Sequence, residues 1–406
     1  MERLHVQLDF GTQQRAVGEL IQRGTEVLFR FDRSFLDNPL PISPIRLPVR
    51  DGTQIPNTSV FEGLFGVFAD SLSDGWGRLL QDRAFTERGI PLETVTPLLR
   101  LANVGATGMG ALTYHPPRSE PVDGGDLDLD ELAAQSQRLL AGERIDNLDE
   151  LLQLGGSSGG ARPKLLVGYH PGTHQLIADR FPLPEGYEHW IIKFNASIDT
   201  PDAAELEFIY SEMARAAGLE VQPCRLFRGK SGRAYFGTKR FDRTATKRFH
   251  LHSAAGLLHD NFRLSALDYG HLMDAAWQLT QTKTAMERIL RMAAFNVFAF
   301  NRDDHSKNCS FLMDETGAWR VAPAYDLTFS RTAHGEHSTT VAGEGRHPGT
   351  KQLLELADTF GIRSARQMID EVKSAIVRFE ALAQPYDLTA ATQTDVLTTL
   401  KRQLKQ

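Results

Sequence analysis

Hydrophobic and polar residues alternate in short runs over the opening part of the chain. Met1–Leu8 has this pattern, which is typical of a half-buried β-strand, and Val27–Phe31 is a second β-forming run. Prolines interrupt the stretch that follows, at Pro39, Pro41, Pro44 and Pro48. From Phe61 to Arg88 the pattern becomes helical, and Asp74–Arg78 interrupts it with a loop or a new helix start.

The middle of the chain predicts a strand-rich unit. Residues 117–129, rich in proline, glycine and aspartate, predict a linker, and Leu129–Gln153 is helix-forming. A predicted helix begins at Thr200–Pro201, a favourable N-cap and first-turn pair, and ends at Gly218. Short apolar runs on both sides of it predict four strands: Leu165–Tyr169, His189–Phe194, Cys224–Phe227 and Ala234–Phe241.

The remainder of the chain predicts mostly helices. Residues 250–300 and about the last 50 residues have helical periodicity. Between them, Cys309–Ala322 predicts a β-hairpin that turns at Asp314–Gly317. We therefore expect an α+β fold with a mixed N-terminal module, then a strand-rich lobe with one helix, then a helical lobe.

Composition and charge narrow the classes of protein. The chain of 406 residues is 41% hydrophobic and 24% charged, which is ordinary for a globular protein with its own core. Its 45 basic and 51 acidic residues give a net charge of -6, which argues against a general polyanion-binding surface. The two cysteines, Cys224 and Cys309, lie far apart without a CxxC partner, as expected in a reducing compartment.

The sequence also predicts no targeting or membrane segment. Met1–Leu8 lacks the basic region and apolar core of a signal peptide. We see no window of about 18 uninterrupted apolar residues, which a membrane span would need. A cytoplasmic protein is the expectation.

Asp303 and Asn308 are the first candidates for chemistry. A phosphoryl-transfer enzyme needs a carboxylate that accepts the proton of the attacking hydroxyl, and an oxygen ligand for Mg²⁺ on the same loop. Protein kinases supply both groups with this spacing. The alternative is that Asp303, Asp304 and Asn308 are loop residues that cap a helix and turn the chain.

The predicted hairpin strengthens the first interpretation. Asn308 precedes its first strand and Asp326 follows its second, and antiparallel strands return their ends to within about 5 Å. Asn308 and Asp326 can therefore share one metal ion. Asp326, in Tyr325–Thr328, takes the place of the metal-binding aspartate of protein kinases.

Gly155–Lys164 is a glycine-rich segment between a predicted helix and a predicted strand. Its glycines would let backbone N–H groups approach a phosphate closely. It is not a Walker A loop, because no Gly-Lys-Ser/Thr follows Gly160 and no long helix begins there. A plain flexible turn is the alternative.

Lys193 lies within the apolar strand His189–Phe194. It is either a charged residue that protects an edge strand or the lysine that binds the α- and β-phosphates of ATP. The second role needs a carboxylate from the next helix, for which Glu205, Glu207 and Glu212 are available. We select Glu207; the alternative for each glutamate is a solvated helix face.

These pieces occur in the order found in protein kinases, and the order is stronger evidence than any single piece. The prediction is an ATP-dependent serine/threonine kinase with a bilobal protein-kinase-like fold, in which Lys193, Asp303 and Asp326 are catalytic. Two alternatives stay open. One is a kinase-fold phosphotransferase acting on a small molecule or lipid. The other is a catalytically silent binding module, which in the family that the chain resembles, given next, would assemble with an antitoxin on DNA.

At these residues the chain resembles the HipA family of bacterial toxin kinases. The family's catalytic loop, Asn-x-Asp-x-His-x-Lys-Asn, matches Asn301–Asn308, and its later Tyr-Asp-Leu matches Tyr325–Leu327. Lys193 matches the phosphate-binding lysine, and Arg240–Arg243 matches the hinge segment. The resemblance covers nearly the whole chain. It implies an N-terminal subdomain at 1–115, a linker and helix at 116–145, an N-lobe at 146–245 and a helical C-lobe at 246–406.

The resemblance implies a site for ATP and Mg²⁺. Backbone at Lys239 and Phe241 would face adenine, Asp242 would reach the ribose, and His305 would order the loop, touch phosphate or serve only structure. Asn308 and Asp326 would hold the metal. The full expected ATP-binding set is Ser157, Ser158, Gly159, Gly160, Lys164, Lys193, Glu207, Lys239, Phe241, Asp242, His305, Asn308, Tyr325 and Asp326.

The resemblance also implies a biological role. Family members are toxins of type II toxin–antitoxin pairs that phosphorylate an aminoacyl-tRNA synthetase and arrest growth, which leads to persistence. The antitoxin, of the HipB type, is a small helix-turn-helix protein that would connect this chain to DNA indirectly, and a homodimer of the kinase would fit such a complex. The family autophosphorylates a serine in the glycine-rich loop, here Ser157 or the adjoining Ser158. The extra serine and glycines depart from the family pattern.

Overall fold

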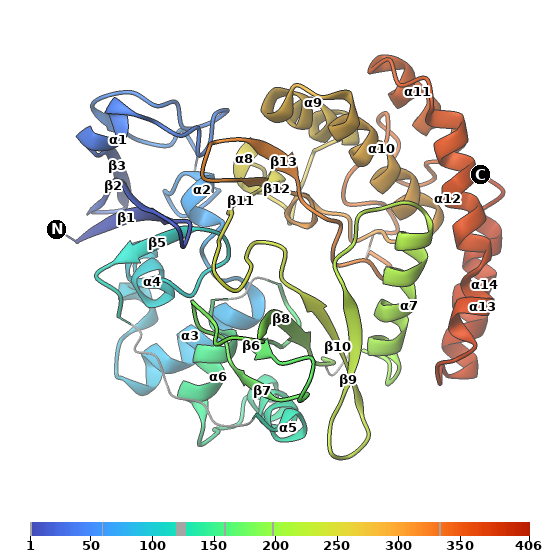
Figure 1. Cartoon of the computed structure of the whole chain (residues 1–406), viewed down its shortest axis with the longest axis horizontal. Helices are drawn as coiled ribbons and strands as arrows, with labels where there is room; N and C mark the ends of the chain where they lie inside the picture. Colours follow the sequence, from blue (N-terminus) through green and yellow to red (C-terminus); the bar gives the residue numbers. More distant parts are fainter. Residues whose placement is uncertain (1, 59, 119–126, 158–159, 197–198, 333) are drawn as a thin grey trace.

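Three sheets carry the β-structure of the described residues in this computed structural model (Figure 1). The structure describes the chain except for residues 1, 59, 119–126, 158–159, 197–198 and 333. Every strand pairing within the three sheets is antiparallel.

The first sheet belongs to the N-terminal part of the chain and has the strand order β4-β3-β2-β1-β5. Buried and more exposed positions alternate along β1, as the sequence predicts. Its apolar face packs with α1, α2 and α4 into one hydrophobic cluster. The elements are β1 (Arg3–Asp9), β2 (Gln14–Arg23), β3 (Glu26–Phe31), α1 (Arg33–Asp37), β4 (Thr53–Gln54), α2 (Gly66–Ala69), η1 (Leu92–Thr94), α4 (Pro97–Val104) and β5 (Leu112–His115).

The second sheet has the order β7-β6-β8-β10-β9, with α7 against β9 and β10. Its buried side chains share a hydrophobic cluster with α5, α6 and also α3, although α3 precedes the linker. The strand β8 is central, so Lys193 at its end does not lie on an edge strand. The elements are α3 (Gly75–Glu87), α5 (Leu129–Leu140), α6 (Leu148–Gly155), β6 (Lys164–Tyr169), β7 (Leu176–Ala178), β8 (Glu188–Lys193), α7 (Ala203–Ala216), β9 (Cys224–Arg228) and β10 (Ala234–Lys239).

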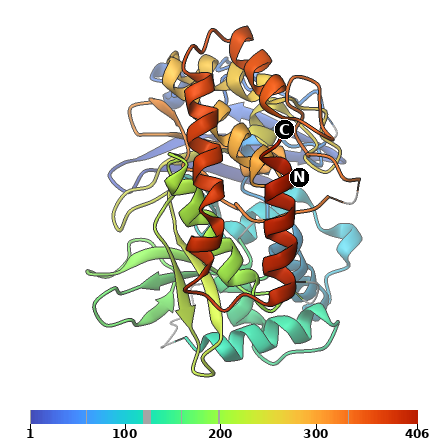
Figure 2. The same cartoon turned by 90° about the vertical axis from the view of Figure 1, so that its right-hand side faces the viewer.

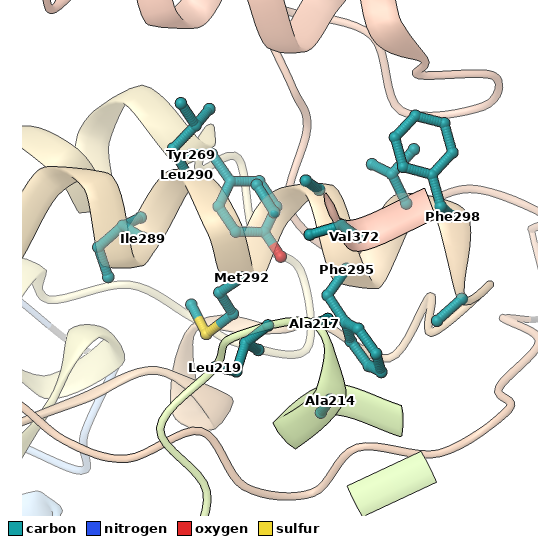
Figure 3. Packing of buried hydrophobic residues seen from close by; sticks show 14 of the residues in the cluster. Ala214, Ala217, Leu219, Tyr269, Ile289, Leu290, Met292, Phe295, Phe298 and Val372 are labelled. Atoms are coloured by element: carbon teal, nitrogen blue, oxygen red, sulfur yellow. The ribbon is translucent and has the colours of Figure 1, made fainter. Parts of the chain in front are cut away.

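The third sheet is small, with the order β11-β12-β13, and helices make up most of the C-terminal part. Residues of α7, α9, α10 and α12 interdigitate in the largest cluster, for example Ala214, Tyr269, Phe295 and Val372 (Figure 3). The elements are β11 (His250–Ser253), α8 (Ala254–Leu258), α9 (Tyr269–Thr280), α10 (Lys283–Phe298), η2 (Ser306–Asn308), β12 (Ser310–Met313), β13 (Trp319–Val321), α11 (Thr350–Thr359), α12 (Ala365–Val377), α13 (Phe379–Ala383) and α14 (Ala390–Gln403).

The C-terminal helices cover the α7 side of the molecule (Figure 2). Asp202, the N-cap of α7, accepts hydrogen bonds from the N–H of Thr389 at 2.7 Å and from the hydroxyl of Thr392 at 3.1 Å. The start of α7 is thereby tied to the start of α14. The helix α7 begins at Ala203, two residues after the Thr200–Pro201 start that the sequence predicts.

Two predicted helices are each divided in the structure. The helical stretch at 61–88 forms α2 and α3, which are separated by Asp70–Asp74. The stretch at 129–153 forms α5 and α6, because Gly142 takes a φ of +85° just beyond α5 and ends it. The predicted hairpin is confirmed as β12 and β13, paired from Phe311 with Val321 to Met313 with Trp319. No helix among the described residues has the length and apolar character of a membrane span.

Candidate active site

Lys193, Glu207 and Asp326 meet in one cluster, although they come from β8, α7 and the segment after β13. The Lys193 Nζ lies 2.5 Å from Oε1 of Glu207 and 2.5 Å from Oδ1 of Asp326. Of the three candidate glutamates, the structure places Glu207 against the lysine, while Glu212 pairs with Arg215. The cluster therefore joins the second sheet to the helical part of the molecule.

The charges of this cluster are set by burial and by one another. Burial by itself lowers the pKa of Lys193, but the carboxylates of Asp326 and Glu207 outweigh it and raise that pKa overall. Lys193 in turn holds the pKa of Asp326 well below its usual range, whereas burial raises the pKa of Glu207. The lysine is therefore charged at neutral pH, and Asp326 is its firmly ionised partner.

A second lysine lies directly across the sheet from the first. Lys164, the first residue of β6, is the register partner of Lys193 in the pairing of β6 with β8. Burial, with the like charge of Lys193, lowers the pKa of Lys164 to about 8. Two cations facing each other on neighbouring strands are unfavourable by themselves, and a polyanion such as a triphosphate would relieve their repulsion.

The neighbouring aspartates Asp303 and Asp304 have different surroundings. Asp304 is buried and accepts hydrogen bonds from the Tyr269 hydroxyl at 2.9 Å, from His337 Nδ1 at 2.9 Å and from the N–H of Ser338 at 2.9 Å. The side chain of Asp303 is 58% exposed. Desolvation raises its pKa and the charge of Asp326 adds to the shift. Asp304 thus fixes the loop, and Asp303 faces outward where a hydroxyl could reach it.

The hairpin brings the two ends of the candidate metal site together. The Tyr325 hydroxyl donates to the Lys307 carbonyl at 2.5 Å and lies 2.6 Å from the Ser310 hydroxyl. Asn308 follows Lys307, and Asp326 follows Tyr325, so the Tyr325 side chain connects the two segments that carry the predicted metal ligands. Asn308 donates through Nδ2 to the Asp303 carbonyl at 2.8 Å, which orients its side chain within the loop.

The residues present fit a metal–nucleotide group. Asp326 has a φ of +56°, a backbone conformation that non-glycine residues rarely adopt and that is concentrated at functional sites. No group of three or more His, Cys, Asp or Glu side chains able to hold a metal occurs among the described residues. Asn308 and Asp326 are the residues that would hold Mg²⁺, an ion that is usually bound by one or two protein oxygens together with substrate phosphate.

The side chain of His305 lies between Asp303 and Phe262. Its Nε2 lies 3.9 Å from Oδ1 of Asp303, and its ring lies 5.3 Å from that of Phe262. The Nδ1 is buried and has no hydrogen-bond partner within the described residues. Because unsatisfied buried nitrogens are uncommon, a ligand oxygen is a reasonable partner for it.

The predicted hinge needs one correction. Asp242 is 0% exposed and accepts hydrogen bonds from Arg240, from Arg243 and from the N–H of Gly110, the last at 2.7 Å. The arginines hold its pKa far below the usual range against the effect of burial. A carboxylate enclosed in this way does not reach a ribose, so the sequence prediction for Asp242 is wrong.

Lys239 and Phe241, the other two residues of the predicted hinge, have surroundings that differ from those of Asp242. The Lys239 N–H donates to the Pro223 carbonyl at 2.9 Å, so a contact with adenine would have to come from the carbonyl of Lys239. The Phe241 ring lies 5.2 Å from the Tyr325 ring, tilted by 35°. This contact brings the hinge next to the residue that precedes Asp326.

The glycine-rich segment follows α6 and leads into β6. Ser157 is 6% exposed, and its hydroxyl donates to the carbonyl of Thr107 at 3.1 Å. The N–H of Gly160 donates to the carboxylate of Asp74. Ser158 and Gly159, also predicted to bind ATP, lie outside the described residues.

Two charged residues near the site escaped the sequence prediction. Asp74 contacts the glycine-rich segment, and Arg162 donates to both oxygens of Asp199 at 2.9 to 3.1 Å. Arg162, Lys193 and Glu207 all border a cavity of about 330 Å³. The position of Arg162 two residues before the predicted phosphate lysine Lys164 was a usable signal, whereas nothing around Asp74 distinguished it from other loop aspartates.

Two family models match this chain. The model of the HipA-like C-terminal domain matches residues 156–379, and that of the HipA N-terminal domain matches residues 8–115. A curated relative from Sinorhizobium fredii (strain NBRC 101917 / NGR234), named "Putative kinase Y4mE", is 26% identical over 362 residues, which are 81% of this chain and 78% of the relative.

A solved structure extends the comparison to the fold. It is that of the Shewanella oneidensis MR-1 toxin–antitoxin system HipA, HipB and its operator DNA complex. It matches 99% of this chain and 96% of its own chain, with a TM-score of 0.69 and 19% sequence identity. The fold is kinase-like, with an N-terminal subdomain added. Since the HipA-like C-terminal domain alone accounts for more than half of the residues, this chain belongs to the HipA family.

Proposed function

We propose that this chain is an ATP-dependent protein serine/threonine kinase that serves as the toxin of a toxin–antitoxin pair. The observation that carries the proposal is the ion-pair cluster in which Lys193 contacts Glu207 and Asp326. In protein kinases a strand lysine paired with a helix glutamate and placed beside the metal-binding aspartate marks a competent site. The family and the kinase name of the Sinorhizobium relative support the same proposal.

Each residue then has a defined role in phosphoryl transfer. Lys164 and Lys193 would bind phosphate oxygens, and Asn308 and Asp326 would hold Mg²⁺, which neutralises charge on the transferred group. Asp303 would accept the proton of the attacking hydroxyl, a role to which its exposure and its raised pKa are suited.

The acceptor we propose is the hydroxyl of a serine or threonine in a protein, and the family suggests a component of translation such as an aminoacyl-tRNA synthetase. Autophosphorylation on Ser157 or Ser158 would then regulate the enzyme. The Ser157 hydroxyl is enclosed and donates to the Thr107 carbonyl, so its modification would require the glycine-rich segment to leave its present position. A phosphate there would add a charge of about -1.5 to -2 next to the proposed phosphate site.

The Shewanella HipA was solved together with HipB and its operator DNA, and we propose a HipB-type antitoxin as the partner here. DNA contact would then be made through that partner, because the chain itself has a net charge of -6. A homodimer within such a complex and a cytoplasmic location belong to the same proposal.

Asp303→Asn tests the proposed function. We expect transfer of label from radioactive ATP to lysate proteins to fall by about 10²- to 10⁴-fold, because the proton acceptor is lost. The Kd of Mg–ATP should stay within about twofold of the wild-type value, since Asp303 is not among the proposed nucleotide ligands. Phosphoproteomics after induced expression of both forms would identify the acceptor. Undiminished transfer would remove Asp303 from this role, and absence of protein phosphorylation by the wild type would refute the proposal.

A further inference from the structure

The stretch from Ser73 to Gln81, which lies in the N-terminal part of the chain, holds the glycine-rich segment at two points. At one end, the Ser73 hydroxyl and the Gln81 side chain both donate to the carbonyl of Gly156, the latter at 3.2 Å. At the other end, the backbone N–H of Trp76 donates to the carbonyl of Gly160 at 3.0 Å. Residues 73–81, which we call the cradle, therefore support the glycine-rich segment, and we expect that segment to cover the phosphates.

Asp74 connects this cradle to the catalytic loop. One carboxylate oxygen, Oδ1, accepts the hydrogen bond of the Gly160 N–H. The other, Oδ2, lies 2.5 Å from Nζ of Lys307, which is one residue before Asn308. The side chain of Asp74 is only 14% exposed. A single buried carboxylate thus contacts both the glycine-rich segment and the loop that carries Asp303.

The charges around Asp74 are consistent with a maintained ion pair. Burial alone would raise the pKa of Asp74, but the charge and hydrogen bond of Lys307 and the Gly160 N–H lower it overall. Lys307 also lies 4.6 Å from the centre of the Phe262 ring, so its ammonium group is held from two sides. Charge-assisted hydrogen bonds of this kind are stronger than neutral ones.

The backbone beside Asp74 leaves little room for adjustment. Gly75 has a φ of +42°, and a Cβ placed there would lie 2.5 Å from the carbonyl oxygen of Gly160 and 2.6 Å from Cα of Ala161. Only glycine allows the two segments to approach this closely. The close contact between the start of α3 and the glycine-rich segment therefore depends on glycine at position 75.

We propose that Asp74 is a positioning residue that holds the glycine-rich segment and Lys307 in the geometry that binds Mg–ATP. The N-terminal part of the chain would then complete the nucleotide site. The inference rests on the proposed kinase function. Its physical basis is that a phosphate-covering loop fixed in advance loses less conformational freedom when the nucleotide binds.

The opposite role is also testable, because an ion pair that occupies Lys307 could withhold it from phosphate. The two roles predict opposite changes in the Kd of Mg–ATP when Asp74 is removed. If Asp74 positions the site, its removal weakens Mg–ATP binding. If Asp74 sequesters Lys307, its removal strengthens binding and increases transfer.

The first titration compares the full wild-type chain with three single variants. Mg–ATP titration should give a Kd about tenfold higher for Asp74→Ala than for wild type, which corresponds to about 1.4 kcal/mol. Asp74→Asn should fall between the two, because its amide oxygen can still accept from Gly160 while the charge opposite Lys307 is lost. Asp149→Ala serves as the matched control, since Asp149 makes an exposed ion pair with Arg88, and its Kd should not change.

A double variant separates positioning from a general loss of structure. Lys307→Met should weaken binding by itself, and Asp74→Ala combined with it should add less than the sum of the two single effects. Additive effects, an unchanged Kd in both Asp74 variants, or tighter binding would each overturn the inference. Asp74→Asn is nearly isosteric and decides the matter if the alanine variant does not fold, with thermal unfolding as the check.

Failure of the proposed function has a different signature. If the wild-type chain binds Mg–ATP and transfers no label to any protein while Asp74→Ala still raises the Kd, the kinase proposal fails and the positioning role stands. If transfer occurs and Asp74→Ala leaves the Kd unchanged, the kinase proposal stands and this inference fails.

Discussion

The catalytic segment, residues 301–308, and the glycine-rich segment, residues 155–164, are supported by different parts of the molecule. The catalytic segment is fixed from within the helical C-terminal part. Asp304 accepts hydrogen bonds from Tyr269 and His337, and Arg302 donates to the carbonyls of Gly335 and Arg346. These partners lie within about 45 positions of the segment, and Lys307 near its end is held in addition by Asp74 from the N-terminal part.

The glycine-rich segment obtains its support from far away in the sequence. Ser73, Asp74, Trp76 and Gln81 contact it, and Thr107 accepts the hydrogen bond of Ser157. The proton-accepting half of the candidate site is thus held mainly by the C-terminal part, with the Asp74–Lys307 ion pair as its link to the N-terminal part, while the phosphate-binding half depends on the N-terminal part. Changes that disturb one half should leave the function of the other measurably intact.

The largest effect should come from breaking the anchor of the catalytic segment. Asp304→Ala removes a buried acceptor of several hydrogen bonds and leaves their donors unsatisfied, at about 1–3 kcal/mol for each group. We expect the free energy of unfolding to fall by about 3 kcal/mol, measured by denaturant titration. Transfer should fall about 100-fold, because Asp303 is displaced.

The Kd of Mg–ATP should rise much less than transfer falls, because the glycine-rich segment and Lys193 are held elsewhere and only Lys307 and Asn308 share the displaced loop. Asp370→Ala, at an exposed position of α12, provides the control and should alter none of the three quantities. Loss of nucleotide binding in a folded Asp304→Ala protein would show that the two halves of the site are not separable.

A smaller effect should follow from pushing the cradle away from the glycine-rich segment. Gly75→Ala places a methyl group against the backbone of Gly160 and Ala161, so the segment must move. We expect Mg–ATP binding to weaken about tenfold and the free energy of unfolding to fall by more than the backbone cost of about 1–2 kcal/mol that a positive φ imposes on alanine, because the clash adds to it. Both are measured on the same preparation, by ligand titration and by denaturant titration.

Gly89→Ala is a matched control for this change, because it lies just beyond the same helix. It also has a positive φ, +70°, but no atom lies within 4 Å of the added Cβ. It therefore incurs the backbone cost of about 1–2 kcal/mol without the contact. Equal losses of Mg–ATP affinity in both variants would contradict the proposed importance of the close approach.

The smallest effect, a few-fold change, should appear in the pH dependence of nucleotide binding. With a pKa of about 8, Lys164 is charged below pH 8 and neutral above it. Because only the charged form attracts phosphate strongly, the affinity for Mg–ATP should fall as the pH rises through 8. In Lys164→Gln the affinity should be lower at pH 7 and nearly constant up to pH 9, whereas Lys351→Gln, at an exposed position, should follow the wild type.

Much of the candidate site could be predicted from the sequence where its residues lie in neighbouring elements. The spacing of Asp303 and Asn308, the hairpin after them and the placement of Asp326 beyond it are local features, and local patterns determine hairpins well. Lys193 and Glu207 were found because strand and helix follow one another in the chain. Their contact needed only the packing of α7 against β10, the strand next to β8.

The contacts that the N-terminal part makes with the phosphate-binding half could not be predicted in the same way. Asp242 stands in Arg240–Arg243, the segment that the family resemblance identifies as the hinge. It is buried because Gly108 and Gly110 arrive from more than 130 positions away to satisfy the same charges. Asp74 likewise occupies an ordinary loop, and only the tertiary fold brings it to Lys307. Alternation and spacing along the chain carry no information about such encounters.

The contact between Asp74 and Lys307 also has a consequence for the order in which the protein is made. The two residues are 233 positions apart, and translation adds about 5–20 residues per second. Roughly 10 to 50 seconds therefore separate the synthesis of the carboxylate from that of the ammonium group that neutralises it. From the synthesis of residue 164 to that of Lys307, a nascent chain has a glycine-rich segment without the contact that connects it to the catalytic loop. The enzyme can become active only after the ribosome has delivered its catalytic loop.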